Sequence, residues 1–210
     1  QIFLSSPTGV HFAPGASIDV GGLVATTLSM SQADFDAGRN IFTNTGATGS
    51  VLNRGSITAT NGYVALLGPQ VANEGVIAAR MGSVTLAAGD KITLDMVGDG
   101  LISVRVDQAA LNASAVNKGT ISADGGSVFM TARSANALLD TVVNNEGVIR
   151  ANTISERGGT IYLDGGSTGV TSVSGTLEAM GLASGVKGGL VSVLGDKVGL
   201  FGNTSINVSG

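Results

Sequence analysis

The chain repeats a short phrase, Asn-x-Gly-x-Ile-x-Ala, which is followed after a turn by Gly-x-Val-x-Leu. Full copies begin at Asn53, Asn73, Asn117 and Asn145, and a weaker copy covers 175–193. A unit of roughly 20–45 residues that recurs in this way is typical of a solenoid, in which each unit buries its apolar face only against its neighbours. The repeat therefore restricts the chain to a repeat architecture.

The phrase alternates with a period of two. In 56–59, Ile and Ala alternate with Ser and Thr, and in 83–86 Val and Leu do the same. Because successive side chains of a strand point to opposite faces, this period predicts strands, and the Gly, Asn and Asp residues around them predict turns. Leucine-rich, ankyrin and tetratricopeptide repeats would each need a helix. We therefore predict an all-β chain, a single domain over 1–210, that forms a right-handed parallel β-helix with short non-helical insertions.

Stacking explains why the unit must repeat. One coil cannot bury its own inward Val, Ile and Leu side chains, but a second coil about 4.8 Å above it pairs every strand and covers every inward face. Each inward aliphatic side chain then contributes roughly 1.5–3 kcal/mol of burial. The repeated phrase is therefore expected to be scaffold.

The repeated asparagines share one register before the strand, and two interpretations remain open. Asn53, Asn73, Asn117 and Asn145 either form a hydrogen-bonded Asn ladder along the stack or each occupy a left-handed turn that asparagine tolerates. The glycines that follow each Asn, and those that open each second strand, are expected to be turn residues with positive φ.

A third strand in each coil is predicted from two similar segments. Gly89-Asp90-Lys91 and Gly195-Asp196-Lys197 both follow a second strand directly and precede an alternating stretch. We expect each coil to carry three short strands, the last opened by Gly-Asp-Lys. The Asp and Lys side chains are expected to be exposed turn charges that contribute little individually.

Several stretches interrupt the pattern. Residues 1–22 form a distinct start, 23–50 read as an extra-helical insertion, and 51–210 as stacked coils with further insertions near 95–115 and 133–142. Insertions in solenoids map to loops on one face, and that face often binds partners. Partner-specific surface is therefore expected in these insertions.

Composition excludes several classes of function. The net charge is −4, only 12% of residues are charged, and no Lys/Arg cluster exists, which argues against a nucleic-acid partner. The absence of cysteine excludes disulfides and thiolate metal sites. No apolar run is long enough for a transmembrane helix. The first residue is Gln1, inside an expected strand, so the chain is expected to be part of something larger or processed.

An enzymatic β-helix is the main alternative from another class, because this fold also hosts polysaccharide chemistry that needs converging carboxylates. The sole histidine, His11, lies in a turn-strand context. Asp124 and Asp164 each precede Gly-Gly-Ser, which would suit Ca²⁺, but they lack the tandem nonapeptide spacing of such sites and indicate turns instead. We predict no catalytic residue, no metal site, no cofactor and no enzyme activity. The outward strand positions are expected to form a solvated surface: Ser83, Thr85, Ser127, Phe129, Thr160, Tyr162 and Asp164.

The N-terminal region carries a family resemblance. Residues 1–10 resemble the "hydrophobic strand, then Asn-Pro-Asn-Gly-Ile" signature of two-partner secretion exoproteins, which include filamentous haemagglutinin and the high-molecular-weight adhesins. Residues 15–28 resemble the Gly-Gly-Leu-x-Ala-Ser/Thr-Thr-Leu stretch of the same family, and the later coils also fit its pattern. The individual motifs are short, and their common order along nearly the whole chain is what makes the resemblance specific.

The turn itself departs from the family pattern. It reads Ser6-Pro7-Thr8-Gly9, so only Pro7 and Gly9 match the family's Asn-Pro-Asn-Gly. Proline fixes φ for a turn and glycine permits the position after it, so we expect the turn to survive. The resemblance implies that Ser6, Pro7, Thr8 and Gly9 form a secretion-motif turn.

The resemblance also implies a function. The chain would be the non-enzymatic secretion domain and early shaft of a large adhesin-like exoprotein, secreted or attached to the surface of a Gram-negative bacterium. An outer-membrane barrel transporter would be its partner, and a host or neighbouring-cell surface another. A fibre subunit that associates end to end through its coils is the structural alternative. The sequence does not distinguish an adhesin from a haemolysin or a contact-dependent toxin.

Overall fold

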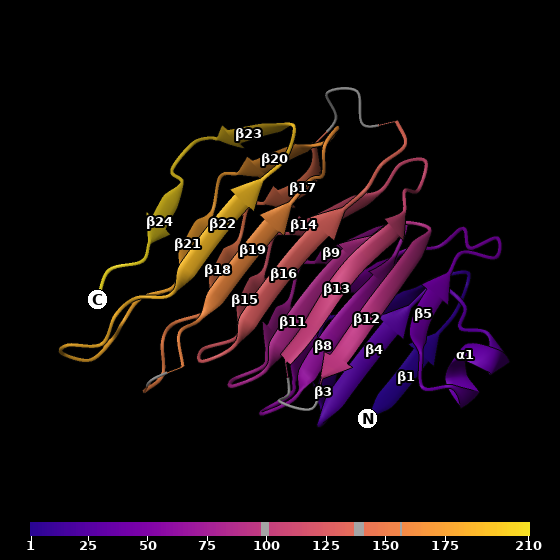
Figure 1. Cartoon of the computed structure of the whole chain (residues 1–210), viewed down its shortest axis with the longest axis horizontal. Helices are drawn as coiled ribbons and strands as arrows, with labels where there is room; N and C mark the ends of the chain where they lie inside the picture. Colours follow the sequence, from indigo (N-terminus) through magenta and orange to yellow (C-terminus); the bar gives the residue numbers. More distant parts are fainter. Residues whose placement is uncertain (98–100, 137–140, 156) are drawn as a thin grey trace.

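The computed structural model describes residues 1–97, 101–136, 141–155 and 157–210. The chain winds through three parallel sheets, each of them seven-stranded, in a fixed order that we call sheets A, B and C (Figure 1). Each full turn of the chain contributes one strand to each sheet, so the described strands form seven stacked coils. The predicted parallel β-helix with three short strands per coil is confirmed.

The strands follow one another along each sheet in chain order. Sheet A consists of β1 (Ile2–Ser5), β4 (Gly22–Thr26), β8 (Tyr63–Gly68), β11 (Ser83–Ala88), β16 (Ser127–Ala132), β19 (Thr160–Asp164) and β22 (Leu190–Leu194). Sheet B consists of β2 (Val10–Phe12), β6 (Val51–Asn53), β9 (Gln70–Asn73), β14 (Ser114–Asn117), β17 (Thr141–Asn145), β20 (Val170–Val173) and β23 (Lys197–Leu200). Sheet C consists of β3 (Ser17–Asp19), β7 (Ser56–Thr58), β10 (Val76–Ala78), β15 (Thr120–Ser122), β18 (Val148–Arg150), β21 (Thr176–Glu178) and β24 (Ser205–Asn207).

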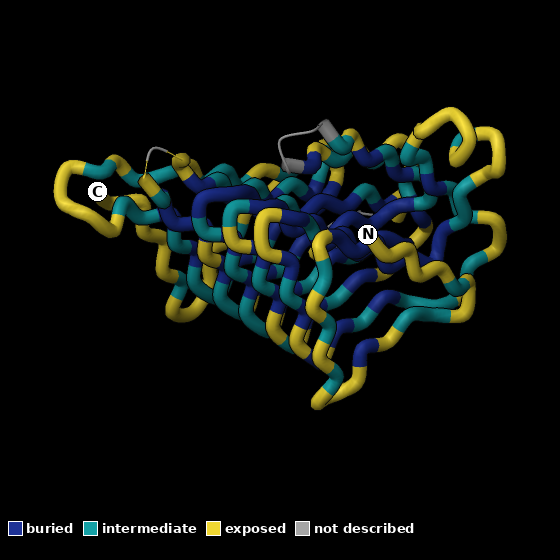
Figure 2. Tube along the Cα trace, turned by 90° about the horizontal axis from the view of Figure 1, so that it is seen from below, coloured by how far each residue is buried: buried dark blue, intermediate teal, exposed yellow. Residues whose placement is uncertain are grey.

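The repeated isoleucine of the phrase forms a column inside sheet C. Ile57 pairs with Ile77, Ile77 with Ile121, and Ile121 with Ile149, and all four side chains are completely buried. Figure 2 shows the buried residues inside the coils and the exposed ones at the corners. The identical register from coil to coil explains why the phrase recurs, because each strand must place the same side chain in the same interior column.

The motif glycines do not have positive φ, so that expectation is wrong for Gly62, Gly75, Gly82, Gly119 and Gly126. They are required instead because successive coils approach one another backbone to backbone. A Cβ on Gly119 would lie 2.0 Å from the carbonyl oxygen of Gly75, and one on Gly82 would lie 1.9 Å from that of Gly62. Any side chain at these positions would separate the coils.

A small antiparallel sheet, sheet D, covers part of sheet A. It contains β5 (Asn40–Thr43), β12 (Lys91–Val97) and β13 (Leu101–Gln108), in the order β13-β12-β5. A short helix, α1 (Gln32–Asp36), precedes β5. Sheet D and sheet A enclose a second apolar core, separate from the coil interior. The larger buried members of this core are Val24, Leu28, Phe42, Leu67, Ile92, Leu94 and Ile102.

Sheet D corrects two predicted boundaries. The extra-helical insertion cannot begin at residue 23, because β4 (Gly22–Thr26) is a regular strand of sheet A and the excursion starts after it. The two Gly-Asp-Lys segments also differ: Lys197 opens the sheet B strand β23, whereas Lys91 opens β12 outside the coils. Gly-Asp-Lys therefore marks a turn that can precede either kind of strand.

The outer face of sheet A is only partly solvated, contrary to expectation. Ser83 and Thr85 are completely buried beneath sheet D, whereas Phe129 and Tyr162, further along the sheet, are half-buried. The predicted insertion at 133–142 includes residues 137–140, which lie outside the described part of the chain. None of the helices in the described residues has the length and apolar character to cross a membrane.

Candidate functional site

The Ser6–Gly9 turn connects β1 to β2 in the first coil. The Gly9 N–H donates to the Ser6 carbonyl oxygen at 3.1 Å, which closes a β-turn with Pro7 at its second position. Gly9 has a φ of 129°, a value that favours glycine, and Pro7 and Thr8 are exposed. The turn therefore presents a proline ring and a threonine side chain to solvent on a fixed backbone.

A loop from the second coil, 46–50, holds this turn from one side. The N–H groups of Thr48 and Gly49 both donate to the Pro7 carbonyl oxygen at 3.0 Å. A Cβ on Gly49 would lie 2.2 Å from the Thr8 carbonyl carbon, so only glycine permits this contact. The 46–50 loop belongs to the excursion that contains α1 and β5, which thus has a direct structural connection to the secretion-motif-like turn.

Asn44 fixes the start of the 46–50 loop. Its side-chain oxygen accepts hydrogen bonds from the N–H groups of Gly46 and Ala47, at 2.9 and 2.7 Å. Its side-chain amide donates to Asp90 Oδ1 at 2.7 Å. Asp90 is half-buried, so the expectation of an exposed turn charge is wrong for this residue. Sequence reasoning missed Asn44, although Asn44-Thr45-Gly46 is a typical Asx-turn sequence.

The four repeated asparagines lie in one line through the protein. The side-chain amide of Asn53 donates to Asn73 Oδ1, that of Asn73 to Asn117 Oδ1, and that of Asn117 to Asn145 Oδ1, each at 2.8 Å. All four side chains are completely buried. Each amide thus satisfies the carbonyl of the next coil in a position where an unpaired polar group would be costly.

The ladder ends where the sequence changes. Phe12 pairs with Asn53 at one end, and Val173 pairs with Asn145 at the other, so neither flanking coil offers an amide. Asn53 Oδ1 instead accepts from the Gly55 N–H at 3.1 Å, and the Asn145 amide donates to the Gly147 carbonyl at 3.2 Å. The ladder is therefore a closed structural unit with no spare group for a ligand.

The remaining titratable groups do not form a reaction centre within the described residues. That part of the chain contains no group of three or more His, Cys, Asp or Glu residues able to hold a metal ion. His11 is exposed on β2. Asp124 accepts from the Asn152 N–H, and Asp164 accepts from the Gly166 N–H, each at 2.8 Å. Asp164 thus closes its own turn, as its Asp-Gly-Gly context predicts, whereas Asp124 joins its turn to the next coil.

Two tyrosines have altered acidity for structural reasons. Burial raises the pKa of Tyr63, which lies beneath sheet D. Burial, together with the nearby Asp164 carboxylate, raises the pKa of Tyr162. A raised pKa favours the neutral form of both phenols.

The family follows from comparison with known proteins. Residues 1–179 match the TPS secretion domain, where TPS denotes two-partner secretion. The chain belongs to the TPS secretion domain family. This TPS secretion domain is 32% identical over 171 residues to the "Heme/hemopexin-binding protein" of Haemophilus influenzae (strain ATCC 51907 / DSM 11121 / KW20 / Rd), covering 78% of the chain and 19% of that protein. A second Haemophilus influenzae protein of the same name is 27% identical over 186 residues, covering 78% of the chain and 20% of that protein.

A solved structure supports the same assignment. The crystal structure of the HMW1 secretion domain from Haemophilus influenzae matches this TPS secretion domain with a TM-score of 0.87 and 32% identity, covering 99% of the chain and 53% of that structure. The chain thus spans about a fifth of the curated relatives and about half of the solved domain. Proteins of this family are secreted or cell-surface proteins of Gram-negative bacteria, so the predicted family and localisation are confirmed.

Proposed function

We propose that this domain directs the export of a longer adhesin-like exoprotein through an outer-membrane barrel partner, without enzyme activity, and that the Ser6–Gly9 turn is part of the recognised surface. The observation that carries the proposal is the match of residues 1–179 to the TPS secretion domain. The exposed Pro7 and Thr8 support the role of the turn, because the 46–50 loop holds their backbone in one conformation. A fixed backbone lowers the ordering cost of binding a partner.

The test is secretion of the full-length exoprotein from a Gram-negative host that also expresses the barrel partner. Pro7→Ala combined with Thr8→Ala removes the presented side chains, and Gly49→Ala displaces the turn through its contact with Thr8. We expect both variants to lower the secreted fraction severalfold. Pro14→Ala is the matched control, because Pro14 is also an exposed turn proline of the first coil. Normal secretion of both turn variants would overturn the role of the turn, and partner-independent secretion would overturn the export function.

End-to-end self-association is a second proposal. The first coil exposes Ile2 and Phe3, at 41% and 42%, and the seventh exposes Leu194 and Leu200, at 45% and 55%. Apolar side chains on the outermost described coils favour association between coils. Analytical ultracentrifugation over a range of protein concentrations tests this: a single monomeric species would contradict it.

A further inference from the structure

The strand β13 forms an open edge on the surface of the protein. Sheet D has the order β13-β12-β5, so β13 is hydrogen-bonded to β12 on one side only. The strand runs over eight residues, Leu101–Gln108, and contains no proline. Edge strands are usually protected by prolines, inward charges or short length, because they otherwise accept a further strand. The inward side chains of β13 are instead the apolar Ile102, Val104 and Val106.

The backbone of β13 directs hydrogen-bonding groups to this open side. The Ile102 N–H donates away from β12, to Ser83 Oγ of sheet A, at 3.0 Å. Backbone groups in an antiparallel pair alternate between the two sides of a strand, and the register of β13 with β12 is regular from Leu101 to Val106. Val104 and Val106 therefore direct their N–H and C=O groups to the same open side as Ile102.

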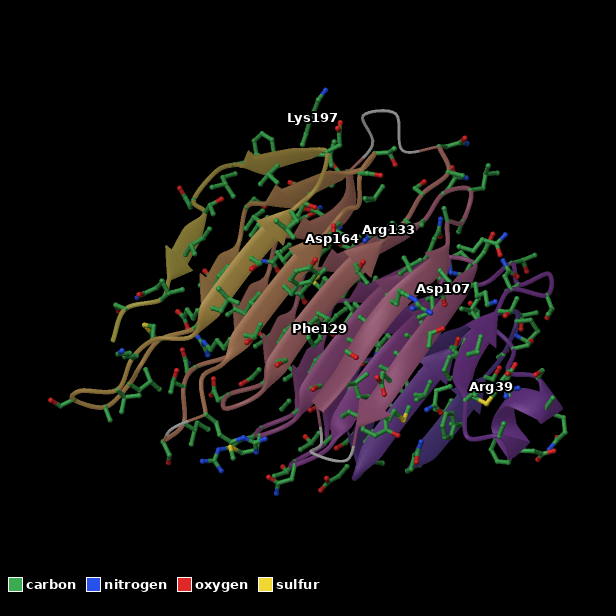
Figure 3. All side chains as sticks on the ribbon, in the orientation of Figure 1. Arg39, Asp107, Phe129, Arg133, Asp164 and Lys197 are labelled. Atoms are coloured by element: carbon green, nitrogen blue, oxygen red, sulfur yellow. The ribbon has the colours of Figure 1, made fainter. Side chains whose placement is uncertain are left out.

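An aromatic floor lies directly beyond that edge. Phe129 on β16 and Tyr162 on β19 are paired neighbours on the outer face of sheet A, with ring centroids 6.1 Å apart. Under sheet D, the same row of sheet A carries the small residues Ala65 and Thr85. Figure 3 shows Phe129 on the uncovered part of sheet A, next to the strands that sheet D covers. Along this outward row of sheet A, the side chains change from small to large where sheet D ends.

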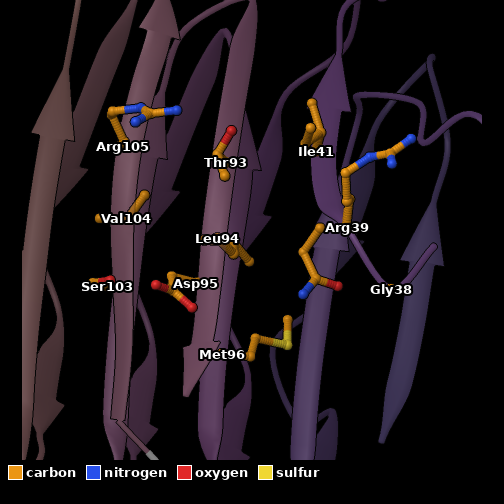
Figure 4. Close-up of a pocket in the computed structure, with 11 residues that line it drawn as sticks. Gly38, Arg39, Ile41, Thr93, Leu94, Asp95, Met96, Ser103, Val104 and Arg105 are labelled. Carbon is orange, nitrogen blue, oxygen red and sulfur yellow. The ribbon is translucent and has the colours of Figure 1, made fainter. Parts of the chain in front are cut away.

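The edge and the floor enclose a groove of about 300 Å³. At one end Arg133 pairs with Asp164 at 2.6 Å, side by side in Figure 3. Arg105 and Asp107 also pair with each other, on the opposite face of β13 from Val104 and Val106. Because these charges are already paired with one another, the groove favours an uncharged occupant. A second pocket, of about 580 Å³, differs: Figure 4 shows it on sheet D, lined by Thr93, Asp95 and Arg105 together with Ile41 and Met96, and it has no aromatic side chain.

The space beyond β13 fits one strand. A strand paired with β13 would lie about 4.8 Å from it, above β16, at the ordinary separation of about 10 Å between stacked sheets. Sheet A continues beneath this position as β16, β19 and β22. A second copy that extended sheet D in the same plane, with its own coils on the same side, would place those coils in the space that these strands occupy. The geometry therefore favours a single extended segment over a second copy.

We propose that the β13 edge and the Phe129–Tyr162 floor form a docking groove for one extended, uncharged segment of a partner protein, which joins sheet D as a fourth strand. Backbone hydrogen bonds to Val104 and Val106 would supply pairing, and alternate apolar side chains of the segment would pack on the two rings. This proposal is independent of the export function, because it involves neither the Ser6–Gly9 turn nor the 46–50 loop.

The test uses phage-displayed random heptapeptides selected on the purified chain. We expect enriched peptides in which uncharged apolar residues alternate with other residues. A fluorescein-labelled copy of the most enriched peptide is then titrated by anisotropy. Val104→Pro removes an outward N–H while leaving the bonds to β12 in place, and Phe129→Ala removes half of the floor. Each should weaken binding about tenfold, which corresponds to about 1.4 kcal/mol. Phe201→Ala, which removes an exposed ring on the seventh coil, should leave binding unchanged.

Two further measurements separate edge pairing from other modes. Hydrogen exchange of the Val104 and Val106 amides should slow in the wild-type complex. Two peptides are then compared, one N-methylated at the odd positions and the other at the even positions, and only the one whose methyl groups face β13 should lose binding. Failure to enrich any alternating peptide, or equal binding of both N-methylated registers, would overturn the proposal. Two other results would also overturn it. One is an oligosaccharide that binds the two rings more tightly than any peptide and whose binding Val104→Pro does not change. The other is a dimer of the chain that Val104→Pro dissociates.

Discussion

Asn44 and Asp90 join two excursions that leave the coil stack far apart in the chain. The Asn44 side-chain amide donates to Asp90 Oδ1 at 2.7 Å, and the Asn44 N–H donates to the Asp90 carbonyl oxygen, also at 2.7 Å. Asn44 also organises the 46–50 loop that contacts Pro7. The exposed first turn is therefore connected, through Asn44, to Asp90, the residue that precedes β12.

The Asn44–Asp90 contact predicts that the same substitution in the two Gly-Asp-Lys segments changes stability by different amounts. Asp90→Ala should lower the free energy of unfolding by about 1–3 kcal/mol, because it leaves the half-buried Asn44 amide without an acceptor. Asp196→Ala is the matched control, because Asp196 occupies the other Gly-Asp-Lys and is exposed, and its effect should stay within about 0.5 kcal/mol. Urea unfolding of the two variants checks this. Equal losses would show that the Asn44 contact contributes nothing.

The Asn ladder predicts a dependence on position. Asn117→Ala removes two ladder bonds: the Asn73 amide loses its 2.8 Å acceptor and keeps only contacts of 3.3 and 3.4 Å to the Gly75 and Thr120 carbonyls, and Asn145 Oδ1 loses its 2.8 Å donor. Each weakened or unpaired buried group costs up to about 1–3 kcal/mol. Asn145→Val shortens the ladder from its end, matches Val173 in the next coil, and removes only one ladder bond, the 2.8 Å bond from the Asn117 amide. We expect the loss for Asn117→Ala to be about twice that for Asn145→Val in urea unfolding. The reverse order would contradict a continuous ladder.

The glycines that stack on one another at the coil corners, such as Gly62 and Gly82, predict a loss of stability on substitution that has a steric cause and does not depend on φ. Gly82→Ala places a Cβ 1.9 Å from the Gly62 carbonyl oxygen, so the coils must separate, and we expect a loss of more than about 3 kcal/mol. Gly21→Ala is the control, since a Cβ there meets nothing within 4 Å and its φ is not positive. Differential scanning calorimetry should give a lower Tm for Gly82→Ala only. A small effect at Gly82 would show that the coil spacing adjusts.

The Asp107 carboxyl in sheet D predicts that part of the folding stability is lost in acid. Burial opposes ionisation of Asp107, but hydrogen bonds from Thr93 and Arg105 outweigh it and hold the pKa of this carboxyl below its ordinary value of 3.8. A lowered pKa contributes stability that is present above 3.8 and is lost as pH falls through the folded-state pKa. NMR titration should give a midpoint below 3.8 for Asp107. Asp107→Asn should remove this component of the pH dependence of Tm between pH 4 and pH 2, about the range over which such a carboxyl titrates.

The repeated phrase was sufficient to predict the β-helix, because register is specified wherever one face of a strand is buried. The same phrase could not explain Gly82 or Gly119, because their requirement comes from a carbonyl in another coil, which local sequence does not contain. Sheet D was missed for a related reason. The segments that begin at Lys91 and Lys197 look alike locally, and only the apolar outer face of sheet A, with Ala65 and Leu67, determines that the first packs outside the coils.

The secretion-motif-like turn was located by resemblance, whereas its support was not predicted. The Ser6–Gly9 sequence indicates a turn, and the structure contains one. The contacts of Gly49 with Thr8 and of Asn44 with Asp90 depend on how the excursion folds back on the first coil. No periodicity marks these residues, because each contact is made once and does not repeat along the stack.

The corners of the coils differ in how much they vary from one coil to the next. The corner between sheets B and C keeps the same Asn-x-Gly connection in coils two to five, as in Asn53-Arg54-Gly55 and Asn117-Lys118-Gly119. The corner between sheets A and B carries the Ser6–Gly9 turn and the long connections 27–50 and 89–113. The corner between sheets A and B therefore accommodates added segments of very different length, while the corner between sheets B and C keeps the spacing of coils two to five constant.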